Sequence, residues 1–567
     1  MSLVRGVSAL LLSALISSSL FAQKPYPPRL RWWGEGRFGM FIHWGPVSLK
    51  EAEISWSRAN TNPKCPNNGP IPAAEYDNLY KRFDPVKFNA DEWVRIAKSA
   101  GMKYMVLTAK HCDGFLLWNS KVSDYNIMHT PFHRDVCGEL AAAAHRAGMK
   151  IGWYFSPMDW KDPDCRNANN TAFVKRMQGE IRELLTQYGR IDLLWFDYDG
   201  GTVPWDQEGT YALVKKLQPG IIIDNRLDLG PNTNAGDPRT VGPNADYFTP
   251  EQWIGGYNDQ KPWESCMTIS RIGQWSWAGK KDGVKPLDSL IEMLVKCAGG
   301  DGNVLLDVGP TPEGVIAPEQ VERLRQIGQW MRTAGESIYR TRGGPYRPGE
   351  YGSSTRSGKQ IYLHIRNWEE DPLRLPPLPS AIVKARVLTG GSVRVKADKR
   401  GIQLFIPAKD RKPMDTIVAL TLDRSAIGMP DLVVPASASL TFGAKATASN
   451  VYHASAEYGP DKAVDGRLDT RWATDDATRS AWLEVDFGKP KAFRRAWIDQ
   501  AYAELHRVRK YRIEYWTGTG WKPCYQGADM PARVNVRFAP VTAQRVRLNV
   551  TESTNGPTIN EFRLFEN

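Results

Sequence analysis

Short apolar segments alternate with amphipathic segments between residues 31 and 339, and this alternation limits the fold more than any other feature of the sequence. The apolar segments cover 38–43, 104–109, 151–155, 193–196, 221–224, 267–269 and 304–308. The helix-like segments cover 90–100, 137–147, 172–188, 211–217, 287–297 and 318–334. Strands that are apolar on both faces are typical of a parallel sheet covered by helices. Seven or eight strand–helix units in about 300 residues favour a closed, (β/α)8-like TIM barrel over an open sheet.

Polar side chains stand at the C-terminal ends of five of these apolar segments. They are His43-Trp44, Lys110-His111, Ser156, Asp197 and Asn225-Arg226. Active sites of such barrels form at this end, from the loops that follow the strands. Five polar ends in succession, rich in His, Asp and Arg, therefore predict a functional site.

The sequence pattern changes after the barrel. From 344 to about 432, short alternating segments are separated by Pro, Gly and Asp, which predicts a small antiparallel β-sandwich. A Pro- and Ser-containing joint then leads into a third β-rich unit, 433–567. We therefore expect a catalytic barrel over 23–343 followed by two β-sandwich domains.

The first 22 residues resemble a secretory signal peptide, with one Arg before an apolar stretch and a cleavage site after Ala22. We expect the mature protein to be exported, either secreted or periplasmic. No later segment approaches the 18 or so uninterrupted apolar residues of a membrane span.

Charge and cysteine content exclude other classes of protein. The net charge of +12 comes from scattered Lys and Arg, whereas a nucleic-acid binder concentrates them on one element. The seven Cys residues show neither a CxxC pair nor a metal-ligand spacing, so we expect mostly buried thiols. The 21 Trp residues fit either core packing or sugar stacking, and composition does not separate the two.

The segment 191–201, IDLLWFDYDGG, is the strongest local signal. Its apolar strand runs through Trp195 into Asp197, which suits a nucleophilic carboxylate held beside an anomeric carbon. The alternative interpretation is an Asp that caps the following helix.

Glycoside hydrolysis needs a second carboxyl group to protonate the leaving oxygen. The candidates are Glu251 and Glu264, which we expect in loops after the fifth strand. Asp246 and Asp199 are weaker alternatives with an expected structural role.

Three further segments fit a sugar pocket. They bring His43 and Trp44, then His111, Asp113 and Trp118, and finally Arg226. Imidazole and guanidinium groups bind sugar hydroxyls, while a Trp face covers the ring. Zinc catalysis is the competing hypothesis, but the sequence has no HExxH motif. We expect no catalytic cofactor.

The ordered segments GMFIHWGPVSL, MKYMVLTAKHCDGF, LLWFDYDG, TPEQ, PWESCMTI and GGDGNVLLDVGPTPEG resemble the α-L-fucosidases of glycoside hydrolase family 29. The resemblance covers roughly residues 30–345. It implies a retaining double displacement on terminal α-L-fucose, with fucosylated oligosaccharides or glycoconjugates as substrates.

The same resemblance assigns roles to individual residues. Asp197 matches the nucleophile and Glu251 the acid/base, with Glu264 as a rival. The residues that match substrate-contacting positions are His43, Trp44, Trp56, His111, Tyr154 (or Phe155), Trp195 and Arg226. The sequence departs from the family twice: a His pair is His111-Cys112 here, and a Glu-Trp pair is Ser55-Trp56, with Glu53 two residues earlier.

The C-terminal segment 462–476 and the following AWLEVDFG resemble the discoidin, or coagulation factor 5/8 type C, domain. Carbohydrate-binding modules of family 32 share this fold, so the domain is expected to bind sugar. Asp461, Asp465 and Asp469 neighbour a loop that holds a structural calcium in such domains, and oxygen-rich turns suit this ion.

Two other functions stay open at this point. The chain could be a non-catalytic glycan-binding protein, or a retaining hydrolase of a related sugar such as galactose. An oligomer is compatible with the sequence.

Overall fold

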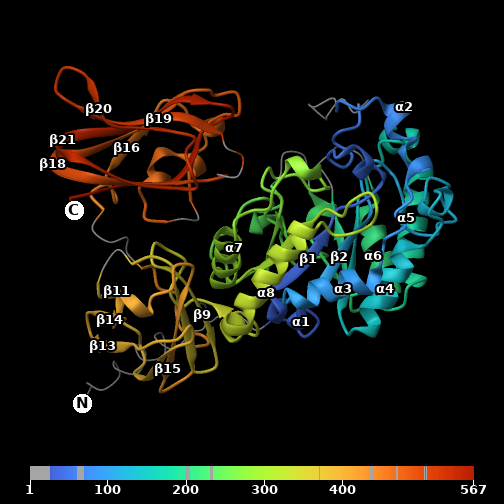
Figure 1. The fold of residues 1–567 in the computed structure, drawn as a ribbon, viewed down its shortest axis with the longest axis horizontal. Coiled ribbons are helices and arrows are strands. Elements are labelled where there is room, and N and C mark those ends of the chain that lie inside the picture. Colours follow the sequence, from blue (N-terminus) through green and yellow to red (C-terminus); the bar gives the residue numbers. More distant parts are fainter. Residues whose placement is uncertain are drawn as a thin grey trace, which may run out of the picture.

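The computed structural model describes residues 26–59, 69–167, 169–197, 205–229, 234–368, 371–434, 439–467, 470–502, 505 and 507–566. Figure 1 shows a barrel of strands and helices followed along the chain by two β-domains. The predicted signal peptide and Asp199 lie outside the described residues. Among the described helices, none combines the length and apolar character needed to cross a membrane.

Seven parallel strands form the sheet of the barrel. They are β1 (Phe38–Ile42), β2 (Tyr104–Lys110), β3 (Lys150–Phe155), β4 (Leu193–Phe196), β5 (Ile222–Ile223), β6 (Glu264–Thr268) and β7 (Asn303–Val308). Their order is β5-β4-β3-β2-β1-β7-β6. The two edge strands are linked through the segment 246–252, since Tyr247 bridges Asp224 and Phe248 bridges Trp263. The (β/α)8-like barrel is thus confirmed, with an irregular segment in one strand position.

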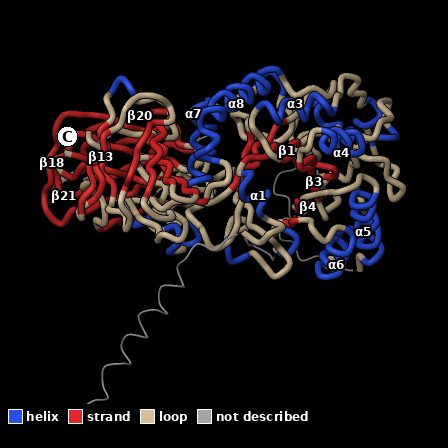
Figure 2. Tube along the Cα trace, turned by 90° about the horizontal axis from the view of Figure 1, so that it is seen from below, coloured by secondary structure: helices blue, strands red, loops and turns tan. Residues whose placement is uncertain are grey.

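Helices surround this sheet (Figure 2). They are α1 (Arg31–Gly36), α2 (Ala73–Tyr76), α3 (Ala90–Ser99), α4 (Val136–Arg146), α5 (Thr171–Thr186), α6 (Gln207–Leu217), α7 (Leu287–Gly299) and α8 (Pro318–Ile338). Asn89, Asp135 and Asp206 accept backbone N–H groups at the starts of α3, α4 and α6. These side chains satisfy donors that a helix start leaves unpaired.

The strands of the barrel are buried and largely apolar because they pack on two sides. In β1, Phe38, Met40 and Ile42 join the layer between sheet and helices, whereas Phe41 points into the barrel. A side-chain period of two along a strand produces this division. The interior cluster takes side chains from all seven strands, among them Phe41, Tyr154, Trp195 and Cys266.

Two sequence boundaries differ from the structure. The sixth strand begins at Glu264 rather than at 267, so the expectation that Glu264 lies in a loop was wrong. The fifth strand contains only Ile222 and Ile223, because the chain turns into a 3-10 helix at Arg226.

The middle β-domain contains two antiparallel sheets. The larger has the order β12-β15-β10-β9-β8 and the smaller β11-β14-β13. The strands are β8 (Arg342–Gly343), β9 (Gly352–Ser357), β10 (Gln360–Ile365), β11 (Leu373–Leu375), β12 (Ile382–Val387), β13 (Arg394–Asp398), β14 (Gly401–Phe405) and β15 (Thr416–Leu422). Apolar side chains of both sheets share one core, as expected for a β-sandwich.

The C-terminal β-domain has its own core and an antiparallel sheet with the order β17-β22-β18-β21-β19-β20, where β16 pairs with β18. Its strands are β16 (Lys445–Ala448), β17 (Trp472–Ala473), β18 (Ala481–Gln500), β19 (Val508–Trp516), β20 (Trp521–Ala528), β21 (Arg533–Ser553) and β22 (Thr558–Phe565). The long strands β18 and β21 shift register where they pair. Such irregularities bend a strand, which lets β18 and β21 continue around the core.

Candidate active site

A cavity of about 220 Å³ opens at the C-terminal ends of the barrel strands. Aromatic, basic, acidic and sulfur-containing side chains line it: Phe41, His43, Trp56, His111, Cys112, Tyr154, Met158, Trp160, Trp195, Asp197, Arg226, Glu251, Cys266 and Trp275. Apolar walls with a few converging polar groups are typical of a small-molecule site. The cavity therefore lies at the ends of the strands, where the sequence predicts a functional site.

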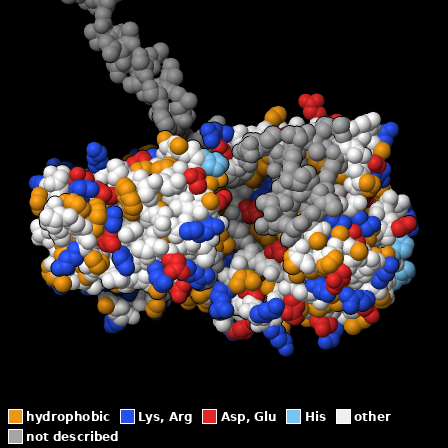
Figure 3. Space-filling view, turned by 90° about the horizontal axis from the view of Figure 1, so that it is seen from above, with side chains coloured by type: hydrophobic (Ala, Val, Ile, Leu, Met, Phe, Trp, Pro, Cys, Tyr) orange, Lys and Arg blue, Asp and Glu red, His pale blue; other side chains and the backbone are white. Residues whose placement is uncertain are grey.

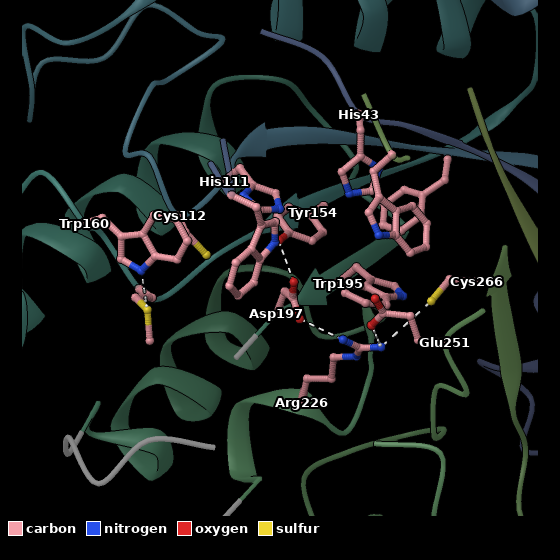
Figure 4. A pocket seen from close by; sticks show the side chains of 14 residues that line it. His43, His111, Cys112, Tyr154, Trp160, Trp195, Asp197, Arg226, Glu251 and Cys266 are labelled. Carbon is pink, nitrogen blue, oxygen red and sulfur yellow. Dashed lines mark hydrogen bonds and ion pairs between the residues drawn. The ribbon is translucent and has the colours of Figure 1, made fainter. Parts of the chain in front are cut away.

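Asp197 follows the last residue of β4 and is held by two side chains. Tyr154 donates its hydroxyl to Asp197 Oδ2 at 2.7 Å, and Arg226 Nη1 donates to Oδ1 at 2.8 Å. The backbone N–H of Asp197 donates to the carbonyl of Phe155 on the neighbouring strand. Each carboxylate oxygen thus has a fixed partner, and Figure 4 shows the side chain directed into the cavity.

Arg226 joins two carboxylates. Its Nη1 binds Asp197, while Nη2 lies 2.8 Å from Glu251 Oε2. Nε donates to Thr249, and the guanidinium lies 4.4 Å from the centre of the Trp195 ring. The nearby carboxylates keep the pKa of this arginine well above its usual value despite burial. Arg226 is therefore a permanent cation that sets the distance between the two acids.

Glu251 lies on the segment that completes the barrel. The backbone on each side of it bonds to Cys266, whose N–H donates to Pro250 and whose carbonyl accepts from Gln252. The Glu251 side chain is 43% exposed, against 27% for Asp197. Glu251 therefore lies nearer the mouth of the cavity than Asp197.

Two histidines present neutral imidazoles to the cavity. His43 Nδ1 lies 2.7 Å from Asp307 Oδ1, and His111 Nδ1 lies 2.6 Å from the hydroxyl of Ser55. Burial lowers the pKa of His111 to about 4 and that of His43 well below its usual value. With Nδ1 bound to the protein, Nε2 is the ring nitrogen available to a ligand.

Stacked rings form one wall of the site. The His111 ring stacks on Tyr154 with an interplanar angle of 6°, and Tyr154 stacks on Trp195 at 17°. A flat wall of this kind suits the C–H face of a sugar ring. The stack also fixes the orientation of Tyr154, which bonds to Asp197.

Several lining residues were not predicted. Trp275 lies 4.9 Å from His43, between ring centres, and its backbone N–H donates to Glu53. Trp160 meets Trp56 edge to face at 5.1 Å. Met158 and Cys266 complete the missed set. Cys266 lies in the segment PWESCMTI, whereas the other three lie outside the quoted motifs, and only their place after β3 or β6 could have suggested them.

Several predicted positions lie outside the cavity, and Trp44, Trp118 and Phe155 are among them. Trp44 is 1% exposed, packs against Phe88 and Trp93, and donates to the Thr311 carbonyl, so its prediction as a pocket residue was wrong. Trp118 is buried and donates to Glu183. Phe155, the alternative to Tyr154, points away from the barrel centre.

Glu264 also lies away from the cavity. It is fully buried at the N-terminal end of β6, where Trp33 Nε1 and the Tyr104 hydroxyl donate to its carboxylate. Cys266 lines the cavity two residues further along the strand, about 6.6 Å at the usual rise. Glu264 therefore lies below the floor of the cavity. Asp246 is likewise buried and paired with Arg29.

The predicted calcium loop is only partly described. Asp465 accepts from the Thr470 hydroxyl and the Arg467 N–H, whereas Asp461 pairs with Lys462. Asp469 lies outside the described residues. Within those residues, no three His, Cys, Asp or Glu side chains form a metal-binding group. Cys112, Cys137, Cys165, Cys266 and Cys297 are buried thiols, as predicted.

Comparison with known proteins gives two family matches. Residues 21–336 match the family described as alpha-L-fucosidase, and residues 445–563 match the F5/8 type C domain. Plasma alpha-L-fucosidase of Homo sapiens is 30% identical over 66% of this chain and 85% of its own length.

Solved structures give the same picture. Alpha-L-fucosidase isoenzyme 1 from Paenibacillus thiaminolyticus is 32% identical, with a TM-score of 0.62 over 70% of this chain and 99% of its own. A GH29 alpha-L-fucosidase of Bacteroides thetaiotaomicron is 26% identical, with a TM-score of 0.61 over 70% of this chain and 97% of its own. That structure holds a covalent intermediate, which was trapped by means of a glutamate-to-glutamine variant. Alpha-L-fucosidase from Vibrio sp. strain EJY3, 20% identical, shares the fold over 95% of this chain and 97% of its own, with a TM-score of 0.64.

Proposed function

Because the chain belongs to the α-L-fucosidases of glycoside hydrolase family 29, we propose that Asp197 is its nucleophile and Glu251 its acid/base. The chain is thus a retaining glycoside hydrolase that acts through a covalent intermediate, as trapped in the Bacteroides relative. One observation carries the assignment of residues. Arg226 holds Asp197 deep in the cavity and Glu251 at the mouth, through its two terminal nitrogens.

The geometry gives each residue a step in the double displacement. An Asp197 oxygen attacks the anomeric carbon as the glycosidic C–O bond breaks, and Glu251 gives its proton to the leaving oxygen. Glu251, now a carboxylate, takes a proton from water, whose oxygen attacks the anomeric carbon and breaks the ester to Asp197. The exposed position of Glu251 supports its role, since the leaving group departs through the mouth.

The remaining polar groups would bind the sugar. His43 and His111 offer Nε2 to hydroxyls, and the Tyr154–Trp195 wall covers a ring face. Trp56 and Trp160, which meet edge to face, line another part of the cavity. The intact set of Asp197, Arg226 and Glu251 argues against a non-catalytic glycan-binding protein, and the family membership favours fucose over galactose.

Azide rescue tests the two assignments. The Asp197→Ala and Glu251→Ala variants are assayed on 4-nitrophenyl α-L-fucoside with and without azide, and Glu264→Gln serves as the control. We expect Glu251→Ala to yield a fucosyl azide of retained configuration and Asp197→Ala one of inverted configuration. Rescue of a Glu264 variant, with Glu251→Ala unaffected, would replace Glu251 by Glu264.

The domain limits and location of the protein are also proposals. Residues 1–22 direct export to the periplasm or the medium, residues 23–343 form the catalytic barrel, and residues 344–432 form the middle sandwich. Residues 433–567 form a discoidin-like carbohydrate-binding domain, which the F5/8 type C match supports. Mass spectrometry of the mature N-terminus and glycan-array binding test these statements.

A structural calcium in this last domain has partial support. Asp465 and Glu561 lie together, and burial raises the pKa of both, that of Glu561 to about 8. A half-buried and a buried carboxylate with oxygen donors nearby suit a hard divalent cation, although Lys462 engages Asp461 and Arg563 engages Glu561. A rise in melting temperature with CaCl2 that EDTA reverses, and that Asp465→Asn abolishes, would support the site.

A further inference from the structure

The C-terminal domain contacts the barrel directly beside Glu251. The guanidinium carbon of Arg471 lies 5.5 Å from the centre of the Trp253 ring, which belongs to the barrel. It also lies 5.0 Å from the Tyr458 ring and 5.5 Å from the Tyr502 ring, both in the C-terminal domain. Cations are attracted to aromatic faces at such distances, more strongly where water is excluded. Arg471 therefore bridges the two domains through ring faces.

Arg471 is directed to these rings rather than to hydrogen-bond acceptors. Its Nε is buried and, within the described part of the chain, has no hydrogen-bond partner. The next residue, Trp472, pairs with Ile559 of β22, so the backbone of Arg471 is held by the sheet. The side chain thus extends from a fixed base toward the barrel.

The barrel holds the backbone of the turn that carries Glu251, and the hydroxyl of Ser265 in β6 donates to the Trp253 carbonyl at 2.9 Å. On the inner side of the turn, the Cys266 N–H donates to the Pro250 carbonyl and the Gln252 N–H donates to the Cys266 carbonyl. On its outer side, Trp253 packs on Gly236, where an added Cβ would lie 2.4 Å from the indole ring. The opposite neighbour of Trp253 is Arg471.

A second contact reaches the same turn. Gln252 Nε2 donates to the carbonyl of Gly273 at 3.1 Å, and a Cβ on Gly273 would lie 3.6 Å from Leu505 of the C-terminal domain. Gln252 therefore hydrogen-bonds to a segment that lies near the C-terminal domain, and Trp253 contacts Arg471 of that domain directly.

Ion pairs hold the C-terminal domain in place away from the cavity. Arg563 lies 2.6 Å from Glu350 of the middle domain, and Arg533 lies 3.9 Å from Glu292 of α7. In Figure 1, α7 faces the two β-domains, and Figure 3 shows the surface hollowed where the barrel meets them. The domain is thus supported at several points and can transmit its position to the turn.

We propose that Arg471 is a positioning residue for Glu251, so that the docked C-terminal domain is part of the catalytic unit. This inference rests on the proposed acid/base role of Glu251. Misplacement of a catalytic group by a fraction of an ångström is costly, and the step that depends on Glu251 is proton donation to the leaving oxygen. Loss of Arg471 should therefore lower kcat/KM most for substrates whose leaving group depends most on that proton.

Leaving-group dependence tests the proposal in the full-length enzyme. The Arg471→Ala and Arg471→Gln variants are compared with wild type on phenyl, 4-nitrophenyl and 2,4-dinitrophenyl α-L-fucosides. We expect kcat/KM to fall about tenfold on the phenyl substrate, a part of the roughly 10²- to 10⁴-fold that a general acid contributes. On the dinitrophenyl substrate, whose leaving group needs no proton, we expect a change of less than about twofold.

Two controls separate the possible failures. Arg545→Ala removes a cation that stacks on Trp516 and Trp521 far from the Glu251 turn, and it should not change the leaving-group dependence. Glu251→Ala should show a steeper dependence than the Arg471 variants. If Glu251→Ala shows none, the acid/base assignment fails, and this inference with it.

If kcat/KM of the folded Arg471 variants falls equally on all three substrates, or does not fall, the positioning role of Arg471 is overturned. The acid/base assignment of Glu251 is not affected by that result. Melting temperatures establish that the variants are folded. Leu505→Ala provides a second test, since it changes the neighbourhood of Gly273 and leaves Arg471 in place. We expect the same dependence of kcat/KM on the leaving group, with a smaller amplitude.

Discussion

The hydroxyl of Tyr154 donates to Oδ2 of Asp197 at 2.7 Å, across neighbouring strands β3 and β4. Arg226 binds the other carboxylate oxygen. The bond from Tyr154 therefore fixes the rotation of the Asp197 carboxylate. Burial and the adjacent Asp197 raise the pKa of Tyr154 well above its usual value, so the phenol stays protonated and remains a donor.

Tyr154→Phe should therefore reduce kcat on 4-nitrophenyl α-L-fucoside by about 10- to 100-fold, which corresponds to about 1.5–3 kcal/mol for a hydrogen bond to a charged group. The ring stack with His111 and Trp195 is retained, so KM should change little. Tyr188→Phe is the matched control, since Tyr188 donates to Asp135 at 2.8 Å outside the cavity. An equal loss of kcat in both variants would contradict the prediction.

Arg226→Lys should lower kcat/KM by about 10²- to 10³-fold, the cost typical of losing one preorganised catalytic donor. A lysine keeps the charge but cannot bind Asp197 and Glu251 at once through two fixed nitrogens. The control is Arg37→Lys at the opposite end of the barrel, where Arg37 pairs with Asp301 at 2.6 Å. That variant should lower the melting temperature and leave kcat/KM of the folded enzyme unchanged.

His111 makes stability depend on pH in a defined direction. Its pKa is about 4 in the folded protein and about 6.5 when exposed, so between these values the unfolded chain holds a proton that the folded chain lacks. The free energy of unfolding therefore rises with pH in this window, by up to about 1.4 kcal/mol per pH unit from this group. His111→Gln should reduce that slope in urea unfolding, whereas His145→Gln, at an exposed position, should not.

Glu264 makes the free energy of unfolding depend on pH in the opposite direction. Burial raises its pKa to about 7, so the folded protein holds a proton that the unfolded chain releases above about 4.5. Its stabilising contribution is present below pH 4.5 and is lost as the pH rises to 7. Glu264→Gln stays neutral, so its free energy of unfolding relative to wild type should increase over this range. Its kcat/KM should be unchanged; a collapse of activity would show that Glu264 takes part in catalysis.

The catalytic region follows largely from the sequence. Asp197, His43, His111 and Arg226 line one cavity because parallel strands bring their C-terminal ends to one face of the barrel, and chain order alone tells which residues follow each strand. Their chemistry could then be read from residue type.

Only the tertiary structure decided how deep each side chain lies and which face of the sheet it is on. His43 and Trp44 are adjacent in sequence, yet His43 lines the cavity and Trp44 packs in the outer core, because successive side chains point to opposite faces. Glu264 and Cys266 share a face of β6, but only Cys266 is high enough to reach the cavity.

The sequence by itself determined the family, the barrel and the strand ends, since these depend on local pattern and chain direction. The places of Glu251, Trp160 and Trp275 in the cavity, and the contact of Arg471 with Trp253, came from packing between segments far apart in the chain. Such contacts depend on strand register and domain docking, which the sum of many weak interactions sets and no local motif encodes.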